Sequence, residues 1–122
     1  MPASSPLHAL STGARLRRIM TQLTSKQRAY LRKLAHPLKP VVLVGGDGVT
    51  EALISSVSDA FNSRELLKVK LQESASIKVR EAANQIADAL EDVHAVQTIG
   101  KTMVLYRRDP EDPEIRLPSA RS

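Results

Sequence analysis

An apolar run that leads directly into a glycine-rich tetrapeptide constrains the fold of this chain most. Val41–Val44 forms the run, and Gly45-Gly46-Asp47-Gly48 follows it without a break. An unbroken apolar run of this kind predicts a strand that is buried on both faces. Glycines permit a tight turn, and apolar residues at helical spacing from Val49 to Phe61 predict a helix with Phe61 in the core. The sequence therefore predicts a strand, a loop and a helix in succession.

A helix is also predicted just before this strand. Thr24 and Gln27 have the spacing of a capping box, which marks the start of a helix. Pro37 and Pro40 are expected to end it, because proline lacks an amide hydrogen and disfavours helix in the residue before it.

The downstream half contains one more helix and three strands by its residue pattern. Apolar and polar residues alternate over Leu67–Gln72, which predicts a half-buried strand. A helix is expected to open near Ser74–Ser76. Two further strands are expected at about Ala95–Ile99 and Met103–Tyr106, joined by a hairpin turn at Gly100-Lys101.

The expected order is α-β-α-β-α-β-β, an α+β sandwich with a four-stranded mixed sheet. The β-α-β units favour parallel pairing, whereas the terminal hairpin requires antiparallel pairing. We expect the domain to span residues 23–108, preceded by a flexible basic tail (residues 1–22), with a short helical turn around Leu16–Met20, and followed by a loosely attached end (residues 109–122). An organellar transit peptide stays open as an alternative for the first segment, because it bears Arg and Ser and lacks acids.

The charge of the chain is distributed unevenly. There are 18 Lys and Arg against 13 Asp and Glu, a net charge of +5, yet all the acidic residues lie at or beyond Asp47. Residues 1–46 carry a net charge of +8, and residues 47–122 carry −3. Such an asymmetry indicates a polyanionic partner or an acidic membrane surface.

Several classes of protein are excluded or disfavoured. The absence of cysteine excludes a disulfide framework and a thiolate metal site, and it suits a reducing cytoplasm. The longest apolar run, Val41–Val44, is far too short to cross a bilayer. His8, His36 and His94 lack metal-ligand spacing, and His94 is expected in the turn before a strand. No serine lies in a nucleophile motif. We therefore expect no metal, no cofactor, no membrane partner, no small-molecule substrate and no enzymatic activity.

The glycine loop and the basic residues are the candidate binding groups. Glycines turn successive amides inward and a following helix adds its positive end, so a phosphate is the natural ligand. The alternative is a tight turn in which Asp47 or Thr50 only caps the helix. Basic residues without interleaved acids would add a salt-sensitive, sequence-independent attraction. The candidate site comprises Gly45, Gly46, Asp47, Gly48, Lys26, Arg28, Arg32, Lys33, Lys39, Lys68, Lys70 and Lys101.

Five blocks in register resemble a known family. They are Leu23-Thr24-Ser25-Lys26-Gln27, Leu34-Ala35-His36-Pro37-Leu38-Lys39-Pro40-Val41-Val42, Gly45-x-x-Gly48-Val49-Thr50-Glu51, Leu67-Lys68-Val69-Lys70 and Ile99-Gly100-Lys101-Thr102-x-Val104-Leu105-Tyr106-Arg107. Together they resemble the CRM (chloroplast RNA splicing and ribosome maturation) domain in its stand-alone bacterial YhbY-like form, over about residues 22–108.

The resemblance implies a fold like the C-terminal domain of translation initiation factor three. It also implies RNA binding, association with precursors of the large ribosomal subunit, and no enzymatic activity. The family's GxxG loop, which is held to contact RNA, maps onto Gly45–Gly48. Asp47 departs from the related KH loops, which commonly carry a basic residue there, and its carboxylate would repel a phosphate unless it caps the helix or faces away.

The expected function is therefore that of a monomeric cytoplasmic protein that binds ribosomal RNA within a large-subunit precursor. Two alternatives belong to different classes. One is a module that docks on a ribosomal protein or an assembly GTPase, with only incidental RNA contact. The other is a small phosphate-handling enzyme that uses the glycine loop, although no general base, nucleophile or metal set is in place for it.

Overall fold

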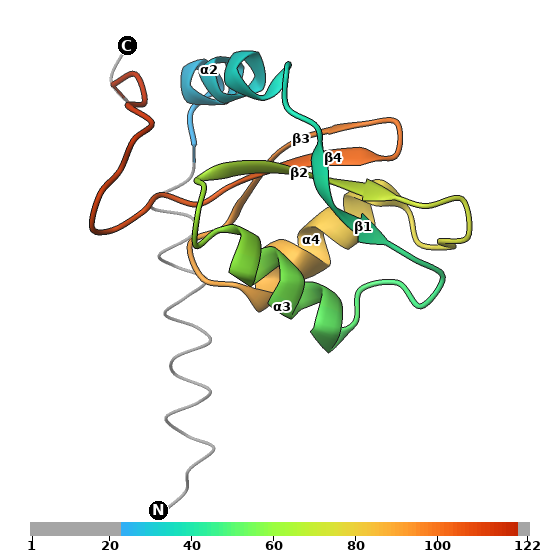
Figure 1. Cartoon of the computed structure of the whole chain (residues 1–122). Helices are drawn as coiled ribbons and strands as arrows, with labels where there is room; N and C mark the ends of the chain where they lie inside the picture. Colours follow the sequence, from blue (N-terminus) through green and yellow to red (C-terminus); the bar gives the residue numbers. More distant parts are fainter. Residues whose placement is uncertain (1–22, 120–122) are drawn as a thin grey trace, which may run out of the picture.

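The computed structural model describes residues 23–119, which form three helices and one sheet (Figure 1). The sheet order is β1-β2-β4-β3, with β1 parallel to β2 and the other neighbours antiparallel. The predicted element order and mixed sheet are confirmed. The elements are α2 (Ser25–Ala35), β1 (Pro40–Val44), α3 (Glu51–Ala60), β2 (Leu66–Leu71), α4 (Val79–Ala89), β3 (His94–Ile99) and β4 (Thr102–Tyr106).

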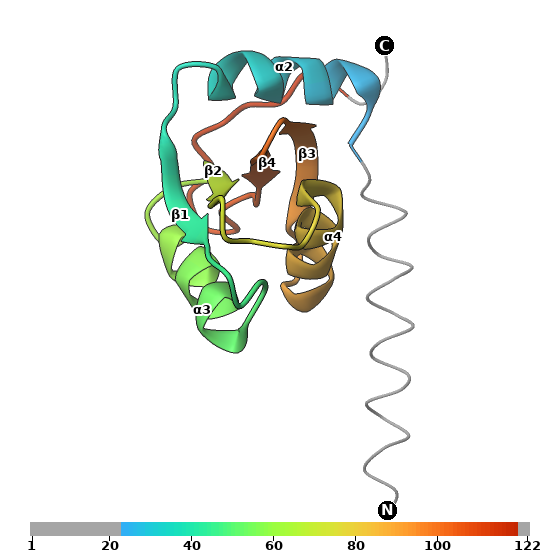
Figure 2. The ribbon, with the colours of Figure 1, turned by 90° about the vertical axis from the view of Figure 1, so that its right-hand side faces the viewer.

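Helices cover the two faces of the sheet unequally. Helices α3 and α4 lie on one face and α2 lies on the other (Figures 1 and 2). The larger core is formed on the first face, where Val57, Phe61 and Ile86 pack against Val69 and other inward strand residues. A smaller cluster, which includes Leu31, Leu66, Val104 and Tyr106, lies under α2. Phe61 is buried, as predicted.

Helix α2 begins and ends where its sequence predicts. The Thr24 hydroxyl accepts a hydrogen bond from the Gln27 amide at 3.1 Å, and the Gln27 side chain accepts one from the Thr24 amide at 3.0 Å. These reciprocal bonds satisfy backbone donors that a helix start leaves unpaired. The helix ends at Ala35, before Pro37.

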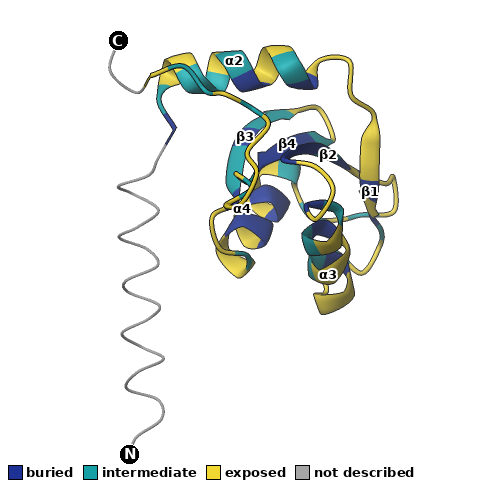
Figure 3. Cartoon of the chain, turned by 60° about the vertical axis from the view of Figure 1, so that its left-hand side comes forward, coloured by how far each residue is buried: buried dark blue, intermediate teal, exposed yellow. Residues whose placement is uncertain are grey.

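Strand β1 corrects one expectation. The sequence predicts burial on both faces, but Val42 and Val44 are buried while Val41 and Leu43 are exposed by 42% and 54%. The reason is that β1 is an edge strand and that α2 leaves part of its own face of the sheet open; Figure 3 accordingly shows β1 as largely exposed. An apolar run does not reveal whether a second layer covers its outer face.

Helix α4 begins later than predicted. Instead of opening near Ser74–Ser76 it begins at Val79, after the extended residue Lys78. The Ala75 amide donates to the Gln72 carbonyl at 3.0 Å, which closes a turn over the residues where the sequence predicts the helix start. His94, expected in a turn, is the first residue of β3.

The C-terminal segment is attached firmly, in contrast to the expected loose end. The buried carboxylate of Glu65 accepts hydrogen bonds from the amides of Asp109 (2.7 Å), Glu114 (2.8 Å) and Ile115 (2.7 Å). Ile115 and Leu117 pack on the cluster under α2. The proline-rich sequence of this segment does not predict these hydrogen bonds to Glu65, because the partners are more than 40 residues apart. It does not predict the apolar packing either. The predicted tail over residues 1–22 lies outside the described residues.

Candidate functional site

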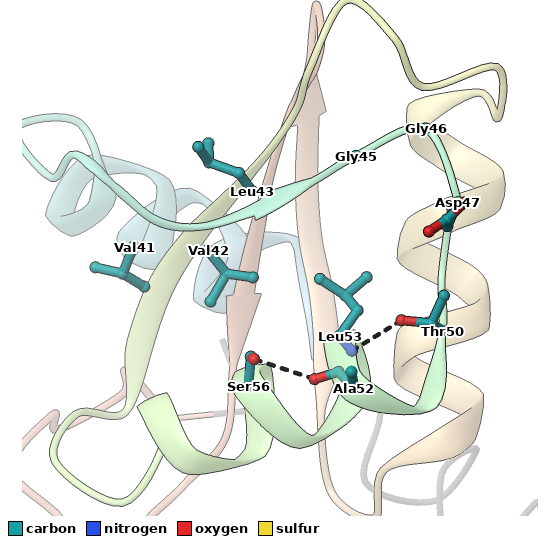
Figure 4. Close-up of a pocket in the computed structure, with 11 residues that line it drawn as sticks. Val41, Val42, Leu43, Gly45, Gly46, Asp47, Thr50, Ala52, Leu53 and Ser56 are labelled. Carbon is teal, nitrogen blue, oxygen red and sulfur yellow. Dashed lines mark hydrogen bonds between the residues drawn. The ribbon is translucent and has the colours of Figure 1, made fainter.

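The glycine loop joins β1 to α3 through a tight turn. The Gly48 amide donates to the Gly45 carbonyl at 3.0 Å, and Gly48 has a φ of +73°, which favours glycine. The Thr50 hydroxyl then accepts from the Leu53 amide at 3.1 Å and caps α3 (Figure 4). Thr50, one of the two predicted candidates, is therefore the cap, and Asp47 is not.

Two hollows flank this loop. One, of about 560 Å³, lies between the loop, the edge of β1 and the first turns of α3, where Leu43, Leu53 and Ser56 line it (Figure 4). The other, of about 580 Å³, lies between the loop and the start of α4, lined by Lys78 and Glu81 among others. Gly46, Asp47 and Gly48 line both hollows. The loop is thus a ridge that a ligand can approach from two sides.

The absence of side chains keeps the backbone of the ridge accessible. Gly46 is exposed, and a Cβ atom built there would lie 3.6 Å from the Ser74 carbonyl oxygen, an ordinary contact. At Gly48 a Cβ would meet no atom within 4 Å. A phosphate could therefore reach the amides near the start of α3, where the helix dipole favours an anion.

Asp47 is the acidic exception on the ridge. Its residue is exposed, and no hydrogen bond ties its carboxylate to the helix start among residues 23–119. The Asp47 carboxylate would avoid repelling a phosphate if it capped the helix or faced away from the ligand, and it does not cap the helix. Lys78, which sequence reasoning missed, lies across the second hollow and supplies an opposite charge. Lys78 directly precedes α4. Because the sequence pattern predicts an earlier helix start, near Ser74–Ser76, it gives no reason to place Lys78 beside the loop.

The cations of α2 fall into two groups. Lys26, Arg32 and Lys33 are exposed. Arg28, in contrast, is half-buried, and its guanidinium donates to the carbonyls of Ala95 at 2.8 Å and Val96 at 3.2 Å. The Arg28 side chain therefore holds α2 against β3, while the side chains of the other three are exposed to solvent.

The remaining predicted cations follow the open part of the sheet. Lys39 is exposed just before β1. Lys68 donates from Nζ to the His36 carbonyl at 3.3 Å, and Lys70 lies beside Leu43 in the parallel register. Lys101, at the hairpin tip, pairs with Glu73 at 3.1 Å between Nζ and Oε2.

The predicted site is therefore extended rather than compact. Strand β1 separates the end of α2 from the glycine loop, and its five residues span about 16 Å. Lys68 and Lys70 on β2 lie along this interval. The structure does not gather the candidate residues around one phosphate; it lines them along a path from α2 to the loop.

The strongest electrostatic feature is the distribution of charge between the layers. Neither α2 nor any of the four strands contains an Asp or Glu, although α2 and β2 together carry Lys26, Arg28, Arg32, Lys33, Lys68 and Lys70. Helices α3 and α4 carry four carboxylates, Glu51, Asp59, Glu81 and Asp88, against Arg80 alone. The α2 side of the sheet is thus basic and the opposite layer is acidic.

Two ionisable groups lie beside the C-terminal segment with shifted pKa values. Burial, and then the nearby Glu65 carboxylate, raises the pKa of Tyr106 above its usual value, whereas Arg108 lowers it. The amides of Glu111 and Asp112 hold the pKa of Asp109 below its usual range. Neither Tyr106 nor Asp109 lines the hollows beside the glycine loop.

Within residues 23–119, no three His, Asp or Glu side chains gather closely enough to hold a metal ion. In that same part of the chain, no helix has the length and apolar character that crossing a membrane requires.

Comparison with known proteins places this geometry in context. The sequence profile of the CRS1 / YhbY (CRM) domain matches residues 23–107. The chain is 41% identical to a Haemophilus influenzae protein named RNA-binding protein, over 81% of this chain and 98% of that one. It is 39% identical to the Bacillus subtilis "Probable RNA-binding protein YqeI", over 79% and 99%. The solution structure of the hypothetical protein SAV1595 from Staphylococcus aureus superposes with a TM-score of 0.68 at 37% identity, over 80% of this chain and 100% of that one.

Proposed function

The chain belongs to the CRS1 / YhbY (CRM) domain family, and from this membership we propose that it binds ribosomal RNA in a precursor of the large ribosomal subunit. It acts as an assembly factor in the cytoplasm, as a monomer, by binding alone and without a cofactor or a reaction of its own. The names of its relatives support RNA as the partner. The ribosomal part rests on the family resemblance of its motifs.

The observation that carries this proposal is the basic layer formed by α2 and the sheet. Six cations and no carboxylate lie on α2 and the four strands. A surface that serves only solubility normally mixes both signs of charge, whereas a polyanion favours one sign along a path. The exposed backbone of Gly46, beside the start of α3 at one end of that path, suits a phosphate contact.

A second candidate function is docking on a ribosomal protein or an assembly GTPase. The exposed apolar side chains of Val41, Leu43 and Ile99 favour it, because they lie on the same open part of the sheet. In this case RNA contact would be incidental.

Filter binding to naked ribosomal RNA over a range of salt concentrations separates the two functions. RNA binding predicts affinity well above that of a control protein of similar net charge. It also predicts that replacing Arg32 and Lys33 by Ala shallows the dependence of log affinity on log salt, by about 0.7–0.9 for each phosphate that the variant no longer neutralises. Arg64→Ala, an exposed arginine outside the basic layer, is the matched control and should leave the slope unchanged. Binding no stronger than that of the charged control would favour docking.

A further inference from the structure

A small hollow lies beside the C-terminal end of α2, on the open part of the sheet and away from the glycine loop. Its volume is about 190 Å³, below the roughly 300–1,000 Å³ of pockets for drug-sized ligands. It has room for a single planar ring system. The residues around it are Arg32, Ala35, His36, Lys68, Gln97, Ile99, Thr102 and Val104.

The strand register explains why these side chains converge. Val104 on β4 is paired with Lys68 on one side and with Gln97 on the other. Thr102, two residues away on the same face, is paired with Ile99. These side chains form the floor and one wall of the hollow, and the last turn of α2 supplies Arg32 and Ala35 above them.

The lining combines an apolar floor with polar groups of both kinds. Val104 is buried, whereas Ile99 is exposed by 60%. The Gln97 amide can both donate and accept hydrogen bonds, as can the Thr102 hydroxyl. The His36 ring and the Arg32 guanidinium are planar groups on which a base can stack.

The charge of the lining is entirely positive. Arg32 and Lys68 line the hollow, and no carboxylate does. Among residues 23–119 the Arg32 side chain has no hydrogen bond or ion pair, whereas that of Arg28 is engaged with β3. The Lys68 ammonium donates to the His36 carbonyl and steadies that wall. An anion attached to a flat, partly apolar ring complements this set of groups.

We propose that this hollow is a seat for one unpaired nucleotide of an RNA strand, with its base over Ile99 and Val104 and its phosphate towards Arg32. The inference rests on the proposed RNA binding and adds a preference to it. A base held inside a duplex cannot enter the hollow, so the chain selects RNA with an unpaired nucleotide. The glycine loop, at the far end of β1, then contacts the backbone of the same strand.

The test compares two RNAs, an unstructured single strand and a fully paired duplex of equal length. Two variants, His36→Ala and Gln97→Ala, alter the hollow without removing a lysine or arginine. His36→Ala is expected to weaken binding of the single strand about tenfold, because it removes a stacking ring. Gln97→Ala is expected to weaken it about two- to tenfold, because it removes a hydrogen-bonding group. Both should leave duplex binding and the salt slope unchanged. Asn84→Ala, which removes an exposed amide from α4, is the matched control and should bind both RNAs like the wild type. Thermal unfolding verifies that each variant is folded.

The outcomes separate this inference from the proposed function. Wild-type protein that binds RNA, with both hollow variants indistinguishable from it, overturns the inference and leaves the proposed function standing. A parallel loss on single strand and duplex also overturns it, because a duplex cannot fill the hollow. An acidic peptide that binds the wild type, and binds the His36→Ala and Gln97→Ala variants more weakly, while RNA binding is unchanged in both, would overturn the inference and assign the hollow to a protein. Wild-type protein that binds neither RNA overturns both proposals.

Discussion

The Arg28 guanidinium donates a hydrogen bond to the main-chain carbonyl of Ala95 at 2.8 Å, which ties α2 to β3. The pairing of β3 with β4 shifts register between Ala95 and Gln97, and such a bulge leaves a residue out of the ladder. Arg28 also bonds the Val96 carbonyl at 3.2 Å, so it satisfies acceptors at this irregular point. The sequence predicts Arg28 as a phosphate contact, but in the structure its side chain holds α2 against β3.

Arg28→Ala is expected to lower the free energy of unfolding by about 1.5–3 kcal/mol, because it removes hydrogen bonds from a charged donor. Lys33→Ala, at an exposed position on the same helix, should change stability by less than about 0.5 kcal/mol. Urea denaturation measures both. Equal stability of the two variants would show that the Arg28 side chain contributes nothing to the fold.

Glu65→Ala is expected to release the C-terminal segment and to destabilise the domain by about 3 kcal/mol, because three amides lose their acceptor. Limited proteolysis should then cut within residues 109–119 much faster than in the wild type. Glu111→Ala, an exposed acid in the same segment, is the control. Unchanged proteolysis of the Glu65 variant would mean that the apolar contacts of Ile115 and Leu117 alone hold the segment.

Asp47→Asn is expected to tighten RNA binding about two- to fivefold, because it removes a negative charge from the exposed ridge. The effect should diminish as salt is raised. Asp59→Asn, an exposed carboxylate at the other end of α3, should have little effect. Filter binding measures both variants. Weaker binding by Asp47→Asn would indicate that the carboxylate itself accepts a bond from the RNA.

Alkaline pH is expected to destabilise the protein through Tyr106. Its pKa is raised in the folded chain, so the unfolded chain loses this proton first. The stability that the neutral phenol contributes is complete below the unfolded pKa of about 10 and is lost as the pH rises through the raised folded value. Tyr106→Phe should show a shallower loss of stability above a pH of about 10 in denaturant titrations. An identical pH dependence in both proteins would contradict this account.

The order of the elements follows from short-range patterns, and the structure confirms it. Local signals such as the Thr24–Gln27 capping box and the glycine turn before Thr50 involve residues three or four apart, so they are visible in the sequence. The exposure of Leu43 depends on where α2 ends above the sheet, which no local pattern encodes. The roles of Glu65 and Arg28 depend on partners more than 40 residues away.

The candidate site is predictable only in part for the same reason. The glycine loop and the basic residues can be identified from their composition and spacing. The family resemblance adds that the loop is held to contact RNA. The predicted strand Val41–Val44 already separates Lys39 from the glycine loop. Local patterns do not identify which strand lies beside β1, so they do not reveal that Lys68 and Lys70 lie along it. The hollow lined by His36, Gln97 and Ile99 joins residues from separate elements and a loop, so only the folded sheet reveals it.

The most direct test of the central claim is co-sedimentation with large-subunit precursors on a sucrose gradient. The wild-type protein is compared with the Gly46→Asp variant, which places a carboxylate on the exposed ridge at a position that has room for a Cβ atom. We expect the variant to stay folded, as circular dichroism would show, and to be absent from the precursor fractions. A folded variant that sediments with the precursor as the wild type does would contradict the claim that the glycine loop binds RNA there.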